Sequence, residues 1–320
     1  MEQSFFGYPI SWVITMTVGI PRALFYHRFG LQWETFFEEL DIPYLLSEAS
    51  NRSHVRAGLT YTVDESCLPL KLYMGHIASL LDRADLLFVP RFVRLGRRDE
   101  FCVRFWGLYD TVQATFPDAR LLSYELKSGK SGHEGRAFLK LGQTLGRGPA
   151  ASLRAYHRAR QRQQEADLKR SAIEQERLNS QSQGPKILLA AQPYIIHDSF
   201  LGAAVTRMIQ TLGGVPITAD AYEKMLCKLN CSILSQDLYW ITNREILGAI
   251  QMARSQVDGI VLLTAFPCGS DCLANELVLR RVKDVPVIQI VLDGQEGQEG
   301  LNTRIESFMD MLSQRRPYRV

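Results

Sequence analysis

Three apolar runs constrain the fold of this chain more than any other feature: KILLAA at 186–191, GIVLLTA at 259–265 and VPVIQIVL at 285–292. A strand with one face in solvent alternates apolar and polar residues, and these runs lack that alternation. Strands that are buried on both faces occur in parallel sheets covered by helices. The runs therefore predict a parallel sheet in the C-terminal half.

Shorter apolar runs alternate with amphipathic stretches through the rest of the chain. In the C-terminal half we expect a strand at 215–218 and helices at 200–212, 221–229 and 238–255. In the N-terminal half we expect strands at 12–20, 42–47, 85–92 and 121–126, and helices at 22–40, 67–81 and 103–116. Alternating strands and helices are typical of parallel sheets with crossover helices. The predicted fold class is α/β, with two doubly wound, Rossmann- or flavodoxin-like domains.

A segment rich in Arg, Gln, Glu and Ala lies between the halves at 151–184 and contains few strand-forming residues. It predicts a long charged helix that joins an N-terminal domain over 1–150 to a C-terminal domain over 185–320. A basic helix can contact RNA or a membrane. Acidic residues are interspersed here and the aromatic residues form no row, which favours a solvated connecting helix.

Composition limits the partners and the compartment. The net charge is +3 and charged residues make up 22% of the chain, so no nucleic-acid partner is expected. The apolar N-terminal stretch at 5–20 follows Glu2, contains Pro9 and has no cleavage pattern of small residues. It is also shorter than the roughly 20 apolar residues that a membrane span needs. We expect a soluble, cytoplasmic protein that does not bind membranes.

The chain has six cysteines, and the cytosol keeps thiols reduced, so disulfides do not explain them. Cys268 and Cys272 follow the run at 259–265, Cys102 follows the expected strand at 85–92, and Cys67 heads the expected helix at 67–81. Ligands of open α/β sheets bind at this kind of position, where strands lead into helices. A helix N-terminus also favours the thiolate and can donate N–H groups to cluster sulfides. We therefore expect an iron–sulfur cluster.

Alternatives to a cluster differ among the cysteines. Cys227 and Cys231 lie one helical turn apart and share one helix face, and either could be a small buried hydrophobic residue. Structural zinc could use the two C-x-x-x-C pairs, but Cys67 and Cys102 would then be unexplained. Asp271 could cap the helix that follows Cys268.

Nucleotide motifs are missing from the sequence. It has no G-x-x-x-x-G-K-[ST] run and no G-x-G-x-x-G turn after a strand. If ATP takes part in the function, a partner protein must hydrolyse it.

Eight motifs in order resemble the family attached to, or encoded beside, CoA-substrate-specific enzyme activases. This family belongs to the wider group of 2-hydroxyacyl-CoA dehydratase components and double-cubane cluster proteins. The motifs are VGIPRALFYHRFG (18–30), ESCLPLKLYMGH (65–76), LFVPRF (87–92), FCVRFWGLYD (101–110), KILLAAQPYIIHDSFLG (186–202), LYWITNREILGAI (238–250), VDGIVLLTAFPCGSD (257–271) and LDGQEGQEGLNTRIESFMDML (292–312). The residues before Met16 fall outside the resemblance, so translation could start at Met1 or Met16.

The resemblance implies a cysteine-held cluster between two α/β subdomains, either one [4Fe–4S] cubane or a sulfide-bridged double cubane that uses all six cysteines. Cys67, Cys102 and Cys268 match the family positions most clearly. The implied partners are an ATP-hydrolysing activase and an acyl-CoA substrate, and a homodimer is left open. Val103 and Ser270 stand where the family has proline, which leaves the subfamily and its substrate open.

Two histidines, His76 and His197, also lie inside these motifs, either as hydrogen-bond donors or acid–base groups or as buried structural residues. The expected function is an iron–sulfur redox protein that takes electrons from the activase and passes them to an acceptor that is hard to reduce. The alternatives are a non-catalytic activase-associated subunit with a structural cluster and a zinc-stabilised CoA-binding module.

Overall fold

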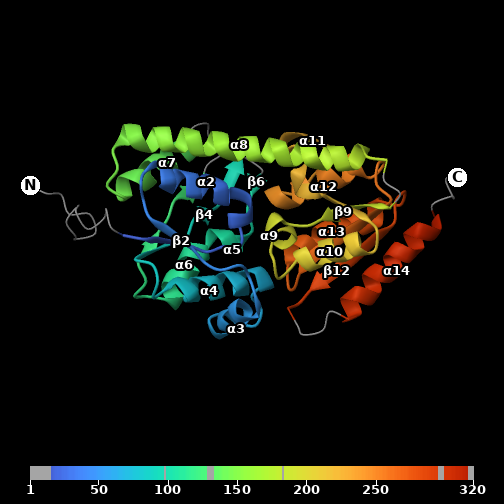
Figure 1. The fold of residues 1–320 in the computed structure, drawn as a ribbon, viewed down its shortest axis with the longest axis horizontal. Helices are drawn as coiled ribbons and strands as arrows, with labels where there is room; N and C mark the ends of the chain where they lie inside the picture. Colours follow the sequence, from blue (N-terminus) through green and yellow to red (C-terminus); the bar gives the residue numbers. More distant parts are fainter. Residues whose placement is uncertain (1–15, 97–98, 128–132, 182–183, 295–298, 316–320) are drawn as a thin grey trace, which may run out of the picture. The chain divides into compact units, whose positions relative to one another are not determined.

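The computed structural model describes residues 16–96, 99–127, 133–181, 184–294 and 299–315. The chain divides into two compact units. The first comprises Met1–Asp64 and Leu70–Ala166, and the second comprises Glu65–Pro69 and Asp167–Val320. Figure 1 labels the elements of both units. The predicted domain division at 150 and 184 stays a prediction.

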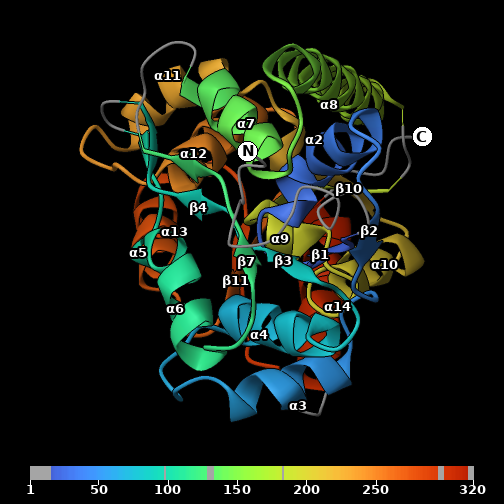
Figure 2. The same cartoon turned by 90° about the vertical axis from the view of Figure 1, so that its left-hand side faces the viewer.

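The first unit is built on a parallel sheet in the order β2-β1-β3-β7. A parallel pair β4-β8 and an antiparallel pair β5-β6 accompany it. The strands are β1 (Val18–Ile20), β2 (Tyr44–Leu46), β3 (Leu86–Phe88), β4 (Arg91–Phe92), β5 (Arg94–Gly96), β6 (Asp99–Glu100), β7 (Leu121–Leu122) and β8 (Glu125–Leu126). Figure 2 shows β1, β3 and β7 in the middle of this unit.

Pro90 explains why the strand predicted at 85–92 is divided into β3 and β4. Proline has no N–H to donate to a strand ladder. The backbone N–H groups of Val89, Arg91 and Val93 still donate to Leu122, Tyr124 and Leu126 at 2.8, 2.9 and 2.9 Å. The two chain segments therefore run side by side along the whole predicted length.

The helices of the first unit are α2 (Tyr26–Glu39), α3 (Arg52–Thr60), α4 (Leu68–Leu80), α5 (Val103–Trp106), α6 (Leu108–Thr115), α7 (His133–Thr144) and the first half of α8 (Pro149–Asn179). Helix α2 packs on one face of the sheet, where Trp33 and Phe37 meet Phe88 with ring centroids 5.1 and 5.4 Å apart. The chain moves one way across the sheet from β1 to β2 and the other way from β2 to β3 and β7. Because crossovers are right-handed, the next crossover helices, α4 and α6, lie on the other face, as Figure 1 shows.

The second unit repeats the same topology with the parallel order β10-β9-β11-β12. Its strands are β9 (Lys186–Ala190), β10 (Val215–Thr218), β11 (Gly259–Ala265) and β12 (Val287–Leu292). Its helices are α9 (Pro193–Ile196), α10 (Ala203–Thr211), the 3₁₀ turn η1 (Ala219–Ala221), α11 (Lys224–Leu234), α12 (Ile241–Ala253), α13 (Gly269–Arg281) and α14 (Glu299–Arg315). All seven residues of β11 are buried, as predicted for a central parallel strand.

One face of the second sheet packs against three helices. Leu188, Ile260 and Leu262 belong to a core cluster that also holds residues of α11, α12 and α13. Helix α11 lies so close to α12 that a Cβ on Gly248 would stand 1.8 Å from the carbonyl oxygen of Cys227. Glycine at 248 therefore sets the spacing of these two helices.

Helix α8 is the connecting helix that the charged segment predicted. One stripe along it is buried, which the expectation of a solvated helix missed: Ser152, Ala155, Tyr156, Ala159 and Gln163 in the first unit, and Glu174 and Leu178 in the second. Within each unit, neighbouring members of the stripe lie one, three or four positions apart, so each part of the stripe follows one helix face. Small and polar side chains fill it, which is why the sequence did not read as amphipathic.

Most other predicted elements are confirmed within a few residues, and the exceptions have local causes. The helix predicted at 103–116 breaks into α5 and α6 at Gly107. Helix α3, between the strand predicted at 42–47 and the helix predicted at 67–81, was not predicted; its N-cap Asn51 accepts from the N–H groups of Ser53 and His54. Helix α7 was not predicted. Residues 12–15 of the first predicted strand lie outside the described residues. Among the described residues, no helix combines the length and the apolar character of a membrane span.

Candidate functional site

The strand order of the second unit creates a switch point between β9 and β11. Chain connections leave these two neighbouring strands in opposite directions across the sheet. Ligands of doubly wound folds bind outside the carboxyl ends of strands at such a point. The residues that follow the two strands are Gln192, after β9, and Cys268 to Asp271, after β11.

Cys268 is the N-cap residue of α13, with φ −130° and ψ 102°. Its Sγ lies 3.5 Å from the hydroxyl oxygen of Ser270. Burial raises the pKa of the Cys268 thiol, and the charges of Asp271 and Cys67 raise it further. A bare thiolate is therefore disfavoured here, and a cation beside the sulfur would stabilise it.

Cys67 reaches the same strand end from far away in the sequence. The segment Glu65–Pro69 belongs to the second unit, and the N–H of Leu68 donates to the carbonyl of Phe266 at 2.9 Å. The charge of Cys67 is among the causes that raise the pKa of Cys268, after burial and the charge of Asp271. Gly294, at φ +75°, follows β12 and approaches Leu68, since an added Cβ would stand 3.0 Å from Leu68 Cδ1. The carboxyl ends of β11 and β12 thus hold the segment that carries Cys67.

Asp271 is a buried carboxylate beside these thiols, 4% exposed. Its Oδ1 accepts hydrogen bonds from Gln192 Nε2 and Asn243 Nδ2, both at 2.7 Å. Burial raises its pKa, while the amides of Gln192 and Asn243 and the Cys268 thiol act in the opposite direction. The prediction that Asp271 caps α13 is wrong, because the N-cap residue is Cys268. The Asp271 side chain instead joins α13 to Gln192, after β9, and to Asn243 of α12. Gln192 follows β9, so its place in the sequence could have marked it as a site residue. No local sequence pattern marks Asn243.

Cys272 lies one turn beyond Cys268 on α13 and is exposed. Between them, Gly269 has open space at its α-carbon, because an added Cβ would meet no described atom within 4 Å. The packing of the described residues therefore does not require a glycine at 269. A bulky group bound beside Cys268 would require one.

Cys227 and Cys231 lie on the inner face of α11 and share that face as predicted. They are 0% and 1% exposed and belong to the core cluster. Burial raises the pKa of Cys227 to about 12 and also raises the pKa of Cys231. This environment favours the packing role that the sequence left open for both residues.

Cys102 belongs to the first unit and is the N-cap residue of α5, with φ −58° and ψ 145°. In the sequence it stands between Phe101 and Phe105, whose ring centroids are 6.3 Å apart. The prediction that Cys102 opens a helix is confirmed, although that helix has only four residues. The described residues include no group of three or more His, Cys, Asp and Glu arranged to hold a metal ion.

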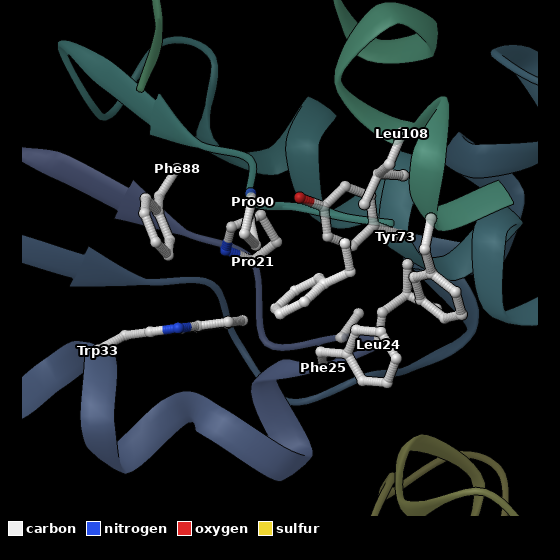
Figure 3. Close-up of a pocket in the computed structure, with 11 residues that line it drawn as sticks. Pro21, Leu24, Phe25, Trp33, Tyr73, Phe88, Pro90 and Leu108 are labelled. Atoms are coloured by element: carbon white, nitrogen blue, oxygen red, sulfur yellow. The ribbon is translucent and has the colours of Figure 1, made fainter. Parts of the chain in front are cut away.

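The corresponding switch point of the first unit is apolar. Pro21, Leu24 and Phe25 after β1 and Pro90 after β3 line a cavity of about 10 Å³, the size of about one water molecule. Figure 3 shows the side chain of Tyr73 directed into this cavity, with its hydroxyl toward Pro90. Leu24 has φ 50°, so the loop after β1 is held in the left-handed region.

His76 is completely buried in the first unit. Its Nδ1 and Nε2 lie 2.8 and 2.9 Å from the hydroxyl oxygens of Ser47 and Ser50, and its ring stacks on His54 at 4.0 Å. Both ring nitrogens are therefore engaged. Of the two roles that the sequence left open for His76, the structural one is favoured.

The fold and the site define a class: a two-unit α/β protein with thiols and a buried carboxylate at a switch point. The chain matches the CoA enzyme activase uncharacterised domain family (DUF2229) over residues 17–222, and it belongs to this family. No curated protein matches the sequence.

Two solved structures show weak likenesses. The laminin-binding protein Lbp of Streptococcus pyogenes is 9% identical with a TM-score of 0.30, covering 93% of this chain and 98% of that chain. Glucosamine-6-phosphate deaminase from Thermotoga maritima is 8% identical with a TM-score of 0.21, covering 97% and 90%. These TM-scores are too low to support any inference.

Proposed function

We propose that the chain is an iron–sulfur redox protein of the acyl-CoA dehydratase and activase system. It takes electrons from an ATP-dependent activase and passes them to an acceptor that is hard to reduce, such as an acyl-CoA. The observation that carries the proposal is the backbone hydrogen bond from Leu68 to Phe266, which holds the segment of Cys67 beside the residues that lead into Cys268. Membership of a CoA enzyme activase domain family supports the same system.

The chemistry of the thiols fits a cationic metal centre. Cluster ligands are thiolates, and burial and the charges of Asp271 and Cys67 disfavour the ionised form of Cys268. Metal binding displaces thiol protons and removes this repulsion. The open space at Gly269 would admit inorganic sulfur next to Cys268.

A [4Fe–4S] cluster takes four thiolates. We propose Cys67, Cys268 and Cys272 of the second unit as three of these ligands, and the use of Cys102 stays a prediction from the sequence. The other two cysteines, Cys227 and Cys231, would be needed only for a double cubane, and their packing in the core argues against that use. When bound, the cluster supplies one-electron chemistry at a potential tuned by burial and by hydrogen bonds to its sulfurs.

The residues of the chain have their own tasks in this proposal. The N–H groups at the start of α13 can donate to sulfur bound at Cys268. Asp271, Gln192 and Asn243 hold α13 in position against β9 and α12. The segment Glu65–Pro69 delivers the Cys67 sulfur through the bond from Leu68 to Phe266.

Anaerobic purification followed by reductive titration tests the proposal. We expect a brown protein with iron and acid-labile sulfide, and an electron paramagnetic resonance signal that changes when titanium(III) citrate is added. A cluster that stays inert under this reductant would identify a structural cluster instead. A colourless protein that contains zinc or no metal would refute the proposal.

A further inference from the structure

A second polar site lies at the same edge of the second sheet and has no task in the proposed function. His197 is the C-cap residue of α9, shortly after β9, and Asp220 lies in η1, directly after the neighbouring strand β10. His197 Nε2 is 2.7 Å from Asp220 Oδ2. The Asp220 side chain is 4% exposed and the His197 side chain is 30% exposed.

The charge state of Asp220 fixes the role of each ring nitrogen. Burial alone would raise the pKa of Asp220, but His197, Lys224 and Arg170 together hold it well below the usual range. An ionised carboxylate only accepts hydrogen bonds. His197 Nε2 must therefore carry a proton, which leaves Nδ1 as the ring nitrogen available for proton transfer.

Other charged groups around the pair are already engaged. Arg170 Nη1, from α8, lies 3.3 Å from Asp220 Oδ2, and Lys224 Nζ, from α11, donates to the Asp220 carbonyl. Glu174 of α8 accepts from the Thr218 N–H at 2.8 Å and pairs with Arg177 at 2.6 Å. Asp198, next to His197, accepts from two backbone N–H groups at 2.9 and 3.0 Å. His197 thus combines a buried carboxylate partner with a partly exposed ring.

We propose that His197 and Asp220 form an acid–base dyad that delivers a proton to the acceptor reduced at this edge. This inference rests on the proposed function, which supplies the electron. The acceptor gains negative charge with the electron, the Nδ1–H bond of the His197 imidazolium breaks, and the proton passes to the acceptor. Neutral imidazole remains, its Nε2–H still held by Asp220, and water returns a proton to Nδ1. A buried carboxylate that orients an imidazole in this way is an established design for proton transfer.

The topology places the dyad within electrostatic range of the thiols. Strand β9 lies between β10 and β11, and neighbouring strands are about 4.8 Å apart, so Asp220 and Cys268 follow strands about 10 Å apart. At that separation and an effective dielectric constant of about 20, one added electron near Cys268 changes proton binding at His197 by about tenfold. For a one-electron centre, a tenfold change corresponds to about 59 mV.

Nitrogen-15 NMR of histidine-labelled protein without a cluster tests the dyad itself. The His197 signals are assigned by their loss in His197→Gln. In the neutral ring we expect the Nε2–H tautomer in the wild type and a mixture of tautomers in Asp220→Asn. An Nδ1–H tautomer in the wild type would overturn the proposal.

Redox titration of the anaerobically reconstituted protein against pH tests the coupling. We expect the wild-type midpoint potential to fall by about 59 mV in total as His197 loses its proton, and the potential of His197→Gln to stay flat over the same range. Gln keeps a donor toward Asp220, so this variant preserves a merely structural contact. His157→Gln, which alters an exposed histidine of α8, should behave as the wild type. Equal pH slopes in the wild type and His197→Gln would contradict the dyad.

Failure of the dyad can be distinguished from failure of the proposed function. A preparation that binds no iron contradicts the proposed function. The tautomer measurement needs no cluster, so it still decides whether Asp220 prepares His197 for proton transfer.

Discussion

The two units have the same strand order, but the carboxyl edges of their sheets are chemically opposite. In the first unit, Pro21, Phe25 and Pro90 close the switch point around a cavity of about 10 Å³. In the second unit, Cys268 and Asp271 occupy the equivalent position. The fold alone therefore does not make a site, and the side chains at the strand ends decide which edge offers groups that a ligand could use.

The apolar edge explains how the first unit is stabilised. Phe92 is 1% exposed, and its ring packs on Phe25 and Phe29 with centroids 4.8 and 5.3 Å apart. An aromatic cluster of this size fills the space that a ligand would need. The polar edge lacks this packing and depends on a few hydrogen bonds.

Phe92→Ala is the sharpest test of the apolar edge. We expect the free energy of unfolding of the first unit to fall by about 4 kcal/mol, because a large buried ring leaves a cavity. Urea denaturation followed by circular dichroism measures the change. Leu59→Ala, at a side chain 48% exposed, is the control and should change it by less than about 0.5 kcal/mol. A loss below about 1 kcal/mol for Phe92→Ala would mean that the cluster is loosely packed.

Asp271→Ala tests the polar edge. It leaves the amides of Gln192 and Asn243 without their shared acceptor, and we expect a loss of about 3 kcal/mol in the unfolding of the second unit. Asp271→Asn keeps the shape and removes the charge.

The pH dependence of Asp271→Asn gives the sign of the charge effect. Because burial raises the pKa of Asp271, the neutral acid stabilises the fold at low pH, and this contribution is lost as the pH rises through the folded pKa. Asp271→Asn should therefore be at least as stable as the wild type at pH 7, with a smaller advantage near pH 4. A large loss at pH 7 would show that the carboxylate charge itself is needed.

The difference between the edges also shows what the sequence could predict. The apolar runs predicted β11 and its neighbours, and the position of Cys268 directly after β11 predicted that it lies at this edge of the sheet. The contact of Cys67 with this strand end depends on a bond between Leu68 and Phe266, residues far apart in the sequence, which no local pattern encodes. The amide of Asn243 likewise reaches Asp271 only through the packing of α12 on α13.

Tyr73→Phe should have a small effect of the opposite sign. The Tyr73 hydroxyl is buried and has no hydrogen-bond partner among the described residues. Removing it relieves a desolvation penalty, and we expect the first unit to gain about 1 kcal/mol in urea denaturation. A loss of similar size would instead show that the hydroxyl has a partner at this edge.

Alkaline pH should reveal that the α11 thiols are packed as neutral groups. Burial raises the pKa of Cys227 to about 12. The neutral thiol therefore contributes its full stabilisation below the pKa of Cys227 in the unfolded chain. This contribution is lost as the pH rises from that value through the pKa in the folded protein. Between pH 7 and pH 10 we expect Cys227 to contribute a loss of about 2 kcal/mol. Urea denaturation of Cys227→Ala at both pH values should show a correspondingly smaller loss. Equal losses would mean that Cys227 ionises in the folded protein.

Iron content after anaerobic reconstitution compares the two thiol environments of the second unit directly. Cys268→Ala alters the edge of the sheet, and Cys231→Ala alters the core, as a matched substitution in the same unit. We predict that Cys268→Ala loses most of its iron and acid-labile sulfide, while Cys231→Ala binds as much as the wild type. Equal iron in the two variants, whether retained or lost, would contradict a cluster held at the switch point of the second sheet.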